Sequence, residues 1–464
     1  MIASRRRPFS AVLVALVLAA ASCSDDDATP SSSAAPSSTE SAATTSSVPS
    51  TTAPNTTALP TVPDTTALPT SSVPSTTAPA TTVPDTTAPP TTVPDASAEE
   101  IPTDGDLYAV PSPIPDVPHG TLLRYQLVEP SVHAGATTYR MMYASESHAG
   151  EPIVVTGVAV IPDAEPPADG RNTITLVHGT TGSADVCAPS KNLAGAGELA
   201  LLSPSVAAGT IIAATDYEGM GTPGVHPYLM GESEGRSGLD AALAARQLPG
   251  AQAGTQLGVM GYSQGGHSAM WTAELAETWA PELDLVGTFA GAPPTEIGLI
   301  AGARITGAAG SFVLLLVNGY EQAYGDEIDP AEYLSVEGLS LLPLADEQCV
   351  GDLSSTAVAE FTSADYAPDA GAGGPWQELT AANDAGTVAV DAPLLIVHSS
   401  TDDVVPAVLS DTATKRLCGL GQVVERRAPD LGGHGAAAVP AYQQAQEWMQ
   451  ARFAGTDPEP VASC

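Results

Sequence analysis

Basic residues are scarce in this sequence: 15 Lys and Arg stand against 53 Asp and Glu, which gives a formal net charge of −38. Proteins that bind nucleic acid present a basic face to the phosphates, and proteins that adhere electrostatically to anionic lipid do the same. The charge balance therefore argues against both kinds of partner. It is consistent with solubility outside the cell.

Cysteine is also scarce, with five residues and no C-x-x-C or Cys/His cluster. That absence argues against a structural zinc site, and no metal or organic cofactor is expected. If Cys23 is modified, an even number of cysteines remains for disulfide bonds in an oxidising compartment. These are Cys187, Cys349, Cys418 and Cys464, and spacing alone leaves all three possible pairings open.

The N-terminus has the composition of an export signal. Arg5, Arg6 and Arg7 form a positive region, and Phe9–Ala21 is a short apolar run that ends in small residues. The run is shorter than the about 20 residues that a membrane-spanning helix needs. Residues 1–23 are therefore interpreted as a lipoprotein-type signal peptide.

The end of this segment, Ala20-Ala21-Ser22-Cys23, resembles a bacterial lipobox, in which the cysteine is lipidated and becomes the mature N-terminus. A diacylated Cys23 supplies the two acyl chains that stable anchoring in a membrane needs. We therefore expect the protein at the extracellular face of the membrane or in the cell wall. Ordinary cleavage, with release of the protein, is the alternative.

Residues 24–104 consist mainly of Ser, Thr, Pro and Ala with scattered Asp, and the motif TTVPD recurs. Such a composition offers almost nothing to a hydrophobic core, so we expect a disordered linker. It either lifts a domain away from the membrane or is a low-complexity tail without a selected length.

Residues 105–464 are expected to form one α/β domain with a mostly parallel sheet and helices on both faces. Apolar runs of strand length alternate with helix-like segments along this region. The expected strands are Leu122–Val128, Thr138–Tyr143, Ile153–Ile161, Thr173–Val177, Thr210–Ala214, Leu257–Met260, Leu285–Phe289, Leu394–Val397 and Val423–Val424. The expected helices are Gly238–Gln247, Gly265–Trp279, Leu409–Leu417 and Ala441–Phe453. The stretch 293–391 breaks the alternation and is expected to be an inserted, mainly helical cap.

A nucleophile motif, G-x-S-x-G, occurs at Gly261-Tyr262-Ser263-Gln264-Gly265. It follows an apolar strand and precedes a helix, and Gly261 and Gly265 permit the tight turn that exposes a serine at the end of a strand. A second match places Ser233 between two glutamates after a Pro/Gly-rich loop. Those carboxylates would oppose a developing oxyanion, so Ser263 is the predicted nucleophile.

A serine hydroxyl needs a base, and three histidines follow Ser263 in the chain: His267, His398 and His434. His267 lies on the expected helix after the nucleophile and is interpreted as a packed or solvent-facing residue. His398 ends an apolar strand and is interpreted as a core histidine. His434 lies in a Gly-rich loop before the last helix, where an imidazole can reach the nucleophile, and is the predicted base.

The acid that orients the base is expected just past the strand Leu394–Val397, where the chain reads Asp402-Asp403-Val404-Val405-Pro406. Asp402 fits the D-x-x-V-P register and is the predicted acid. Asp403 is one residue late and is interpreted as a charge at a helix N-terminus.

The tetrahedral intermediate of such a reaction needs preorganised hydrogen-bond donors. One expected donor is the backbone N–H of Gln264, directly after the nucleophile. The other is the backbone N–H of Thr180, in the Gly-rich turn after the strand Thr173–Val177. The alternative for that turn is a plain connection between strand and helix.

With these residues in place, the chain resembles the secretory lipase family, of the lipase A type, within the α/β-hydrolase superfamily. The resemblance covers about His119 to Phe453. Its most specific parts are the segment from Thr215 to Pro223, similar to the D-Y-x-G-x-G signature, and His226-Pro227-Tyr228. The carboxylates of this signature, Asp216 and Glu218, are interpreted as structural.

The resemblance implies a helical cap over an acyl-binding tunnel and the disulfides Cys187–Cys349 and Cys418–Cys464. One departure is Gln264, which stands where fungal members carry glycine. Its side chain is expected to narrow the site, which favours esterase over long-chain lipase activity.

The leading hypothesis is hydrolysis of an ester or lipid substrate through an acyl-enzyme on Ser263. An acyltransferase of envelope lipids and a peptidase use the same triad. A tethered, non-catalytic binding protein on a hydrolase scaffold is the alternative from a different class.

Overall fold

The structure is a computed structural model that describes residues 98–195, 197–371, 373–456 and 464. The expected signal peptide, the lipidation site Cys23 and the linker as far as residue 97 lie outside the described residues. Within the described ranges, no helix is both long enough and apolar enough to cross a membrane. The fold described below belongs to the compact unit Val93–Cys464.

A ten-stranded sheet forms the centre of this unit, in the order β1-β2-β3-β4-β6-β5-β7-β8-β9-β10. Its strands are β1 Glu99–Ile101, β2 Leu122–Val128, β3 Ala136–Glu146, β4 Pro152–Pro162, β5 Arg171–Val177, β6 Ile211–Thr215, β7 Ala253–Tyr262, β8 Asp284–Gly291, β9 Leu394–Val397 and β10 Val424–Arg427. The pairs β2–β3, β3–β4 and β4–β6 are antiparallel, and the pairs from β6 to β10 are parallel. The mostly parallel sheet predicted from the sequence is therefore confirmed.

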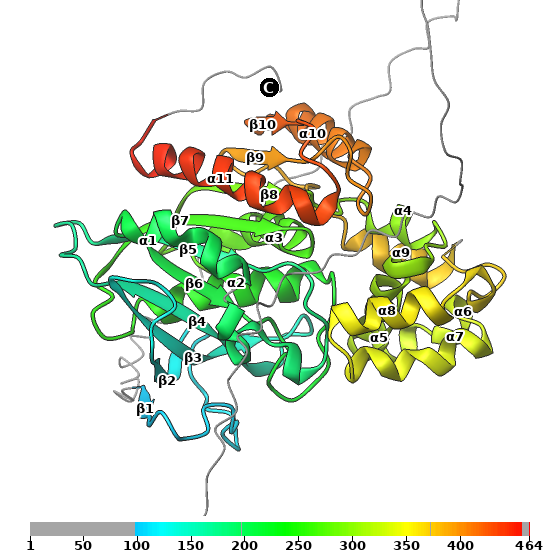
Figure 1. Cartoon of the computed structure of the whole chain (residues 1–464), viewed down its shortest axis with the longest axis horizontal. Helices are drawn as coiled ribbons and strands as arrows, with labels where there is room; N and C mark the ends of the chain where they lie inside the picture. The colour runs from blue at the N-terminus through cyan, green and yellow to red at the C-terminus, as the bar shows by residue number, and fades with distance from the viewer. Residues whose placement is uncertain (1–97, 196, 372, 457–463) are drawn as a thin grey trace, which may run out of the picture. The chain divides into compact units, whose positions relative to one another are not determined.

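Helices cover both faces of the sheet, as Figure 1 shows. On one face, α2 Gly231–Ala245 and α3 Gln264–Trp279 pack against the sheet through a cluster that includes Leu239 and Val259. On the other face, α1 Ser203–Ala207 and α11 His434–Phe453 share a cluster with residues of the central strands. The helix α10, Val408–Leu420, joins β9 to β10. Coverage on both sides explains why a strand such as β6 is buried along its whole length.

A helical insertion separates β8 from β9, as expected for the stretch 293–391. Its helices are α4 Ile297–Ala301, α5 Gly310–Tyr324, α6 Pro330–Tyr333, α7 Val336–Leu341, α8 Val350–Glu360 and α9 Gly374–Ala382. In Figure 1 they form a group beside the sheet. The cap has its own apolar core, in which the rings of Tyr320, Tyr333 and Trp376 pack together.

Among the boundaries that differ from the sequence-based expectations, three differ most. β1 lies inside the segment expected as linker, because Glu99 gains an ion pair with Arg124 and its strand pairs with β2. α2 begins at Gly231 and not at the expected Gly238, and so includes Ser233. α11 begins at His434, because Pro440 is accommodated within the helix and does not mark its start.

Candidate active site

Ser263 lies at the sharp turn between β7 and α3, with backbone angles φ 60° and ψ −121°. A side-chain-bearing residue rarely adopts a positive φ, and such strain persists only where the surroundings impose it. Here the N–H of Ser263 donates to the carbonyl oxygen of Gly291 at the end of β8, at 2.8 Å. The turn therefore presents the serine at the carboxyl edge of the parallel strands.

The two glycines of the motif allow this turn to pack closely. A Cβ atom on Gly261 would lie 2.1 Å from the carbonyl oxygen of Gly265. A Cβ atom on Gly265 would lie 2.0 Å from the carbonyl oxygen of Val177 in β5. Any larger residue at either position would push these backbone segments apart. Glycine is therefore required for the close backbone packing of the turn and not only for its flexibility.

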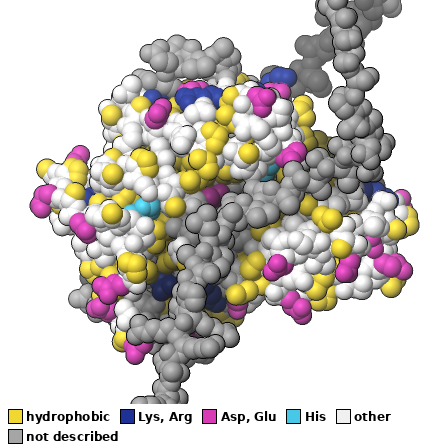
Figure 2. All heavy atoms as spheres, viewed as in Figure 1, with side chains coloured by type: hydrophobic (Ala, Val, Ile, Leu, Met, Phe, Trp, Pro, Cys, Tyr) yellow, Lys and Arg dark blue, Asp and Glu magenta, His cyan; other side chains and the backbone are white. Residues whose placement is uncertain are grey.

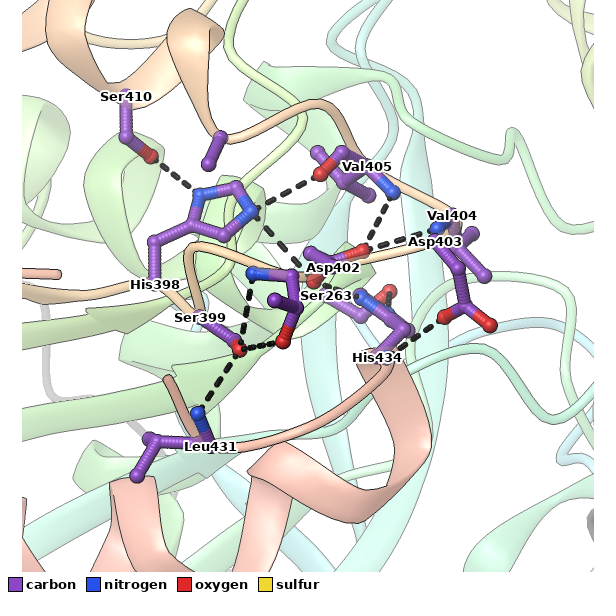
Figure 3. Close-up of polar contacts among 12 residues, drawn as sticks. Ser263, His398, Ser399, Asp402, Asp403, Val404, Val405, Ser410, Leu431 and His434 are labelled. Carbon is purple, nitrogen blue, oxygen red and sulfur yellow. Dashed lines mark hydrogen bonds and ion pairs between the residues drawn. The ribbon is translucent and has the colours of Figure 1, made fainter. Parts of the chain in front are cut away.

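Figure 3 shows Ser263, His434 and Asp402 connected by hydrogen bonds, although they come from three separate segments. His434 Nε2 lies 2.8 Å from Ser263 Oγ, and His434 Nδ1 lies 2.7 Å from Asp402 Oδ2. A carboxylate only accepts, so these partners assign the proton to Nδ1 and leave Nε2 to accept from the serine hydroxyl. This is the geometry of a nucleophile, a general base and an orienting acid.

Asp402 is held in its ionised form. Its side chain is fully buried, and burial alone would raise its pKa. Hydrogen bonds from His398, from His434 and from the backbone N–H of Val404 outweigh burial and hold the pKa of Asp402 below its usual range. A permanently charged Asp402 stabilises the imidazolium that His434 becomes when it takes the serine proton.

Asp403 also contacts His434. Its Oδ1 accepts from the backbone N–H of His434 at 2.8 Å. His434 is the first residue of α11, so Asp403 is indeed a charge at a helix N-terminus, but at α11 and not at the helix that follows Asp403 in the chain. The two adjacent carboxylates therefore hold the same histidine, one by its ring and one by its backbone.

The other candidates lie in buried contacts. Ser233, in α2, donates to Glu218 in the segment after β6. His267 is fully buried, with Nδ1 2.9 Å from Glu234 Oε2, so it is not solvent-facing. His398 is buried as expected, but it contacts Asp402, which its interpretation as a core residue did not foresee.

The two expected oxyanion donors belong to segments that pass close to the nucleophile. Gln264 is the first residue of α3, so its backbone N–H has no acceptor within the helix. Thr180 follows Gly179, whose Cα is so near the nucleophile that a Cβ there would lie 3.8 Å from Ser263 Cβ. The turn after β5 therefore passes close to the nucleophile.

The side chain of Gln264 does not behave as expected. It is 2% exposed and donates to Glu234 Oε1 at 2.7 Å. Because it is enclosed in this buried cluster, it is not free to narrow the site, and the argument for esterase over lipase from this residue fails.

Glu198 was missed by the sequence analysis. Its Oε2 accepts from the N–H of Gly179 at 3.0 Å, directly beside the expected oxyanion loop. Burial raises its pKa to about 7. It lies in a region of short 3₁₀ helices without periodicity, so no sequence pattern could have identified it.

Both disulfides implied by the resemblance are present, Cys187–Cys349 and Cys418–Cys464. The first joins the segment after the expected oxyanion loop to the cap, and Gly182 also forms a β-bridge with Cys349. No cluster of three or more potential metal ligands was found within the described residues.

The parallel sheet, the strained serine turn and the inserted helical cap together define an α/β-hydrolase with a serine at its nucleophile position. The chain belongs to the secretory lipase family, whose family profile matches residues 187–460.

The curated relatives are similar to this chain at low sequence identity. It is 26% identical over 211 residues to a Mycobacterium tuberculosis protein named probable inactive lipase, a match covering 43% of this chain and 47% of that protein. It is 23% identical over 399 residues to lipase A of Moesziomyces aphidis, covering 78% and 82%. It is 29% identical over 243 residues to a secreted triacylglycerol lipase of Malassezia globosa, covering 48% and 51%. The chain thus spans about half the length of the first and third of these relatives.

Solved structures show the same fold. Candida antarctica lipase A superposes with a TM-score of 0.67 at 20% identity, over 77% of this chain and 87% of that one. The rice cell wall degrading esterase LipA of Xanthomonas oryzae superposes with a TM-score of 0.60 at 22% identity, over 73% and 98%.

Proposed function

We propose that this protein hydrolyses carboxylic esters through an acyl-enzyme formed on Ser263. The observation that carries the proposal is the pair of contacts at His434, 2.8 Å to Ser263 and 2.7 Å to Asp402, on a strained turn. His434 Nε2 takes the hydroxyl proton while Ser263 Oγ attacks the ester carbonyl. The negative oxygen that forms is stabilised by the N–H groups of Gln264 and Thr180.

The second half of the reaction follows from the same groups. Protonated His434 gives its proton to the leaving alcohol, which breaks the ester bond and leaves the acyl group on Ser263. A water molecule, deprotonated by His434, then attacks the acyl-enzyme. The bond to Ser263 Oγ breaks, His434 returns the proton to that oxygen, and the acid is released. Asp402 remains ionised throughout and stabilises the imidazolium.

The substrate class is an ester or a lipid, supported by relatives named lipase A and secreted triacylglycerol lipase. Export is supported by those names and by the signal-like residues 1–23. Attachment to the membrane through a lipid on Cys23 is part of the proposal.

A second candidate function is a non-catalytic binding protein on the same scaffold, because one relative is named probable inactive lipase. The hydrogen-bonded Ser263, His434 and Asp402 favour the enzyme, since a binding scaffold has no need of this arrangement.

The test is hydrolysis of nitrophenyl esters, from acetate to palmitate, by the full chain and by Ser263→Ala. We expect activity in the wild type, loss of at least about a thousandfold in the variant, and labelling of the wild type alone by a fluorophosphonate. A folded wild type that neither hydrolyses any ester nor reacts with the fluorophosphonate would leave the non-catalytic function as the better account. Including an alcohol acceptor distinguishes hydrolysis from acyl transfer by the products.

A further inference from the structure

The segment His226-Pro227-Tyr228 contacts both residues that are expected to supply the oxyanion donors. The hydroxyl of Tyr228 lies 2.8 Å from Thr180 Oγ1. His226 Nε2 lies 2.8 Å from Gln264 Nε2. Thr180 and Gln264 belong to different strand-to-helix connections, so this segment is a physical link between the two sides of the nucleophile.

The contact between His226 and Gln264 has a defined polarity. His226 Nδ1 lies 3.1 Å from the carbonyl oxygen of Glu218, which only accepts, so Nδ1 carries the proton. Burial lowers the pKa of His226 to about 4, so the ring is neutral near neutral pH and Nε2 is an acceptor. Gln264 Nε2 donates one hydrogen to this nitrogen and the other to Glu234 Oε1 at 2.7 Å.

Both amide hydrogens of Gln264 are therefore used, and all the groups involved are buried: His226 and Glu234 are 0% exposed and Gln264 is 2% exposed. Water cannot replace these partners readily at such a site. The side chain of Gln264 is consequently fixed in place, and it is carried by the residue whose backbone N–H starts α3.

Tyr228 has a corresponding role on the other side. Its ring is buried, and its hydroxyl reaches the side chain of Thr180 in the turn after β5. The segment itself is backed by the cap: a Cβ on Gly319 of α5 would lie 2.6 Å from the backbone nitrogen of Tyr228. The helix α5 therefore packs directly against the backbone of the segment that carries Tyr228.

We propose that His226 and Tyr228 are positioning residues that hold the two oxyanion donors of this protein at their working separation. The inference rests on the proposed ester hydrolysis at Ser263 and deepens it. Neither residue touches the reacting atoms: His226 acts through the side chain of Gln264, and Tyr228 acts through that of Thr180.

The first test compares Tyr228→Phe with Tyr333→Phe in the full chain. Each variant removes one hydroxyl from a buried tyrosine, but Tyr333 donates to Ala301 within the cap. Removing an oxyanion donor outright lowers kcat by about 10²–10³-fold, so displacing one is expected to lower kcat by roughly tenfold. We expect that loss in Tyr228→Phe with KM unchanged, and wild-type kcat in Tyr333→Phe. Equal kcat values in wild type and Tyr228→Phe would overturn the role of Tyr228.

A double-mutant cycle with Thr180→Val separates positioning from general destabilisation. If the hydroxyl of Tyr228 acts through Thr180 Oγ1, Tyr228→Phe has no further effect on kcat once Thr180→Val is present. Additive losses would contradict the proposed contact. Matched melting temperatures for Tyr228→Phe and Tyr333→Phe establish that the difference in kcat is not a difference in folding.

The second test measures binding of a trifluoromethyl ketone, whose adduct with Ser263 carries the oxyanion. His226→Asn and Tyr228→Phe are expected to weaken this adduct by the same factor by which they lower kcat, because both quantities report on the donors. Unchanged adduct affinity in both variants would overturn the inference while leaving the hydrolase proposal intact. A wild type that is inactive towards esters and fluorophosphonate would overturn both proposals.

Discussion

His398 Nε2 lies 3.4 Å from Asp402 Oδ2, so the carboxylate that orients His434 has a second imidazole beside it (Figure 3). The same nitrogen lies 3.0 Å from the carbonyl oxygen of Val405, and Nδ1 lies 2.7 Å from Ser410 Oγ. Both partners of Nε2 are acceptors, so Nε2 carries the proton and Nδ1 accepts from the serine. His398 thereby donates to Asp402 Oδ2, the same buried carboxylate oxygen that lies beside His434 Nδ1.

Replacing His398 by asparagine is expected to lower kcat by about tenfold, because Asp402 loses a donor that fixes its Oδ2 opposite His434. A factor of ten corresponds to about 1.4 kcal/mol, the order expected for one hydrogen bond to a charged group. The measurement is kcat with a nitrophenyl ester. Ser410→Ala, which leaves Nε2 in place, is the control and should change kcat much less. Equal losses in the two variants would mean that His398 acts only by packing.

The adjacent carboxylates Asp402 and Asp403 provide a matched pair of isosteric variants. Asp402→Asn removes the charge that fixes the tautomer of His434, and loss of kcat by about 10⁴-fold is expected, as for triad carboxylates in general. Asp403→Asn keeps an oxygen that accepts from the His434 N–H, so a loss of no more than about tenfold is expected at that helix N-terminus. A larger effect at Asp403 than at Asp402 would reverse the assignment of the orienting acid.

The sheet and the residues at its carboxyl edge were predictable because their sequence signals are local. A parallel strand buried on both faces is a continuous apolar run, as in β9, Leu394–Val397, whose predicted and observed bounds coincide. Ser263 and Asp402 each follow such a run within a few residues, so the order of elements already brings them to one edge.

The features that the sequence analysis did not predict depend on contacts between segments that are distant in the sequence. His398 to Asp402 spans one loop, but Gln264 to Glu234 and Gly179 to Glu198 depend on how α2 and the 3₁₀ helices pack. The residues next to a polar residue in the sequence do not indicate which buried group will be its hydrogen-bond partner. The strand β1 was missed for the same reason, because it is stabilised by its pairing with β2 and its own composition does not indicate a strand.

The disulfide Cys187–Cys349 is expected to support activity as well as stability. It lies next to the hydrogen bond from Val350 N–H to the carbonyl oxygen of Thr181, at 2.9 Å, and so joins the proposed oxyanion loop to the cap. Replacing both cysteines by serine is expected to destabilise the protein by roughly 2–5 kcal/mol and to lower kcat.

The other disulfide, Cys418–Cys464, is the control, because it joins α10 to the last residue of the chain. Its double serine variant should lower the melting temperature and leave kcat near the wild-type value. The measurements are the melting temperature of each variant and its kcat at one temperature well below unfolding. An equal fall in kcat in the two variants would argue against a specific tie to the oxyanion loop.

Glu198 is expected to make the protein less stable as the pH rises towards neutrality. Burial raises its pKa from 4.5 to about 7, although the Gly179 N–H and the Tyr442 hydroxyl favour the charged form. Between those two values the folded state binds a proton that the unfolded state has already released. The free energy of unfolding therefore falls with rising pH, by at most about 1.4 kcal/mol per pH unit from this group. The contribution is fully present below about pH 4.5 and lost above about pH 7.

In Glu198→Gln this dependence is absent, since the amide does not titrate. The measurement is the melting temperature of the wild type and the variant at intervals from pH 4 to about pH 8. The difference between the two curves isolates the effect of Glu198 from those of other carboxyls with a raised pKa, such as Glu274, whose pKa desolvation also raises to about 7. Glu447→Gln, at an exposed position on α11, is the control and should follow the wild type.

We expect Glu198→Gln to gain stability relative to the wild type as the pH rises through that range. If it instead loses stability there, Glu198 is stabilised as the anion by the Gly179 N–H and the sign of the argument is wrong.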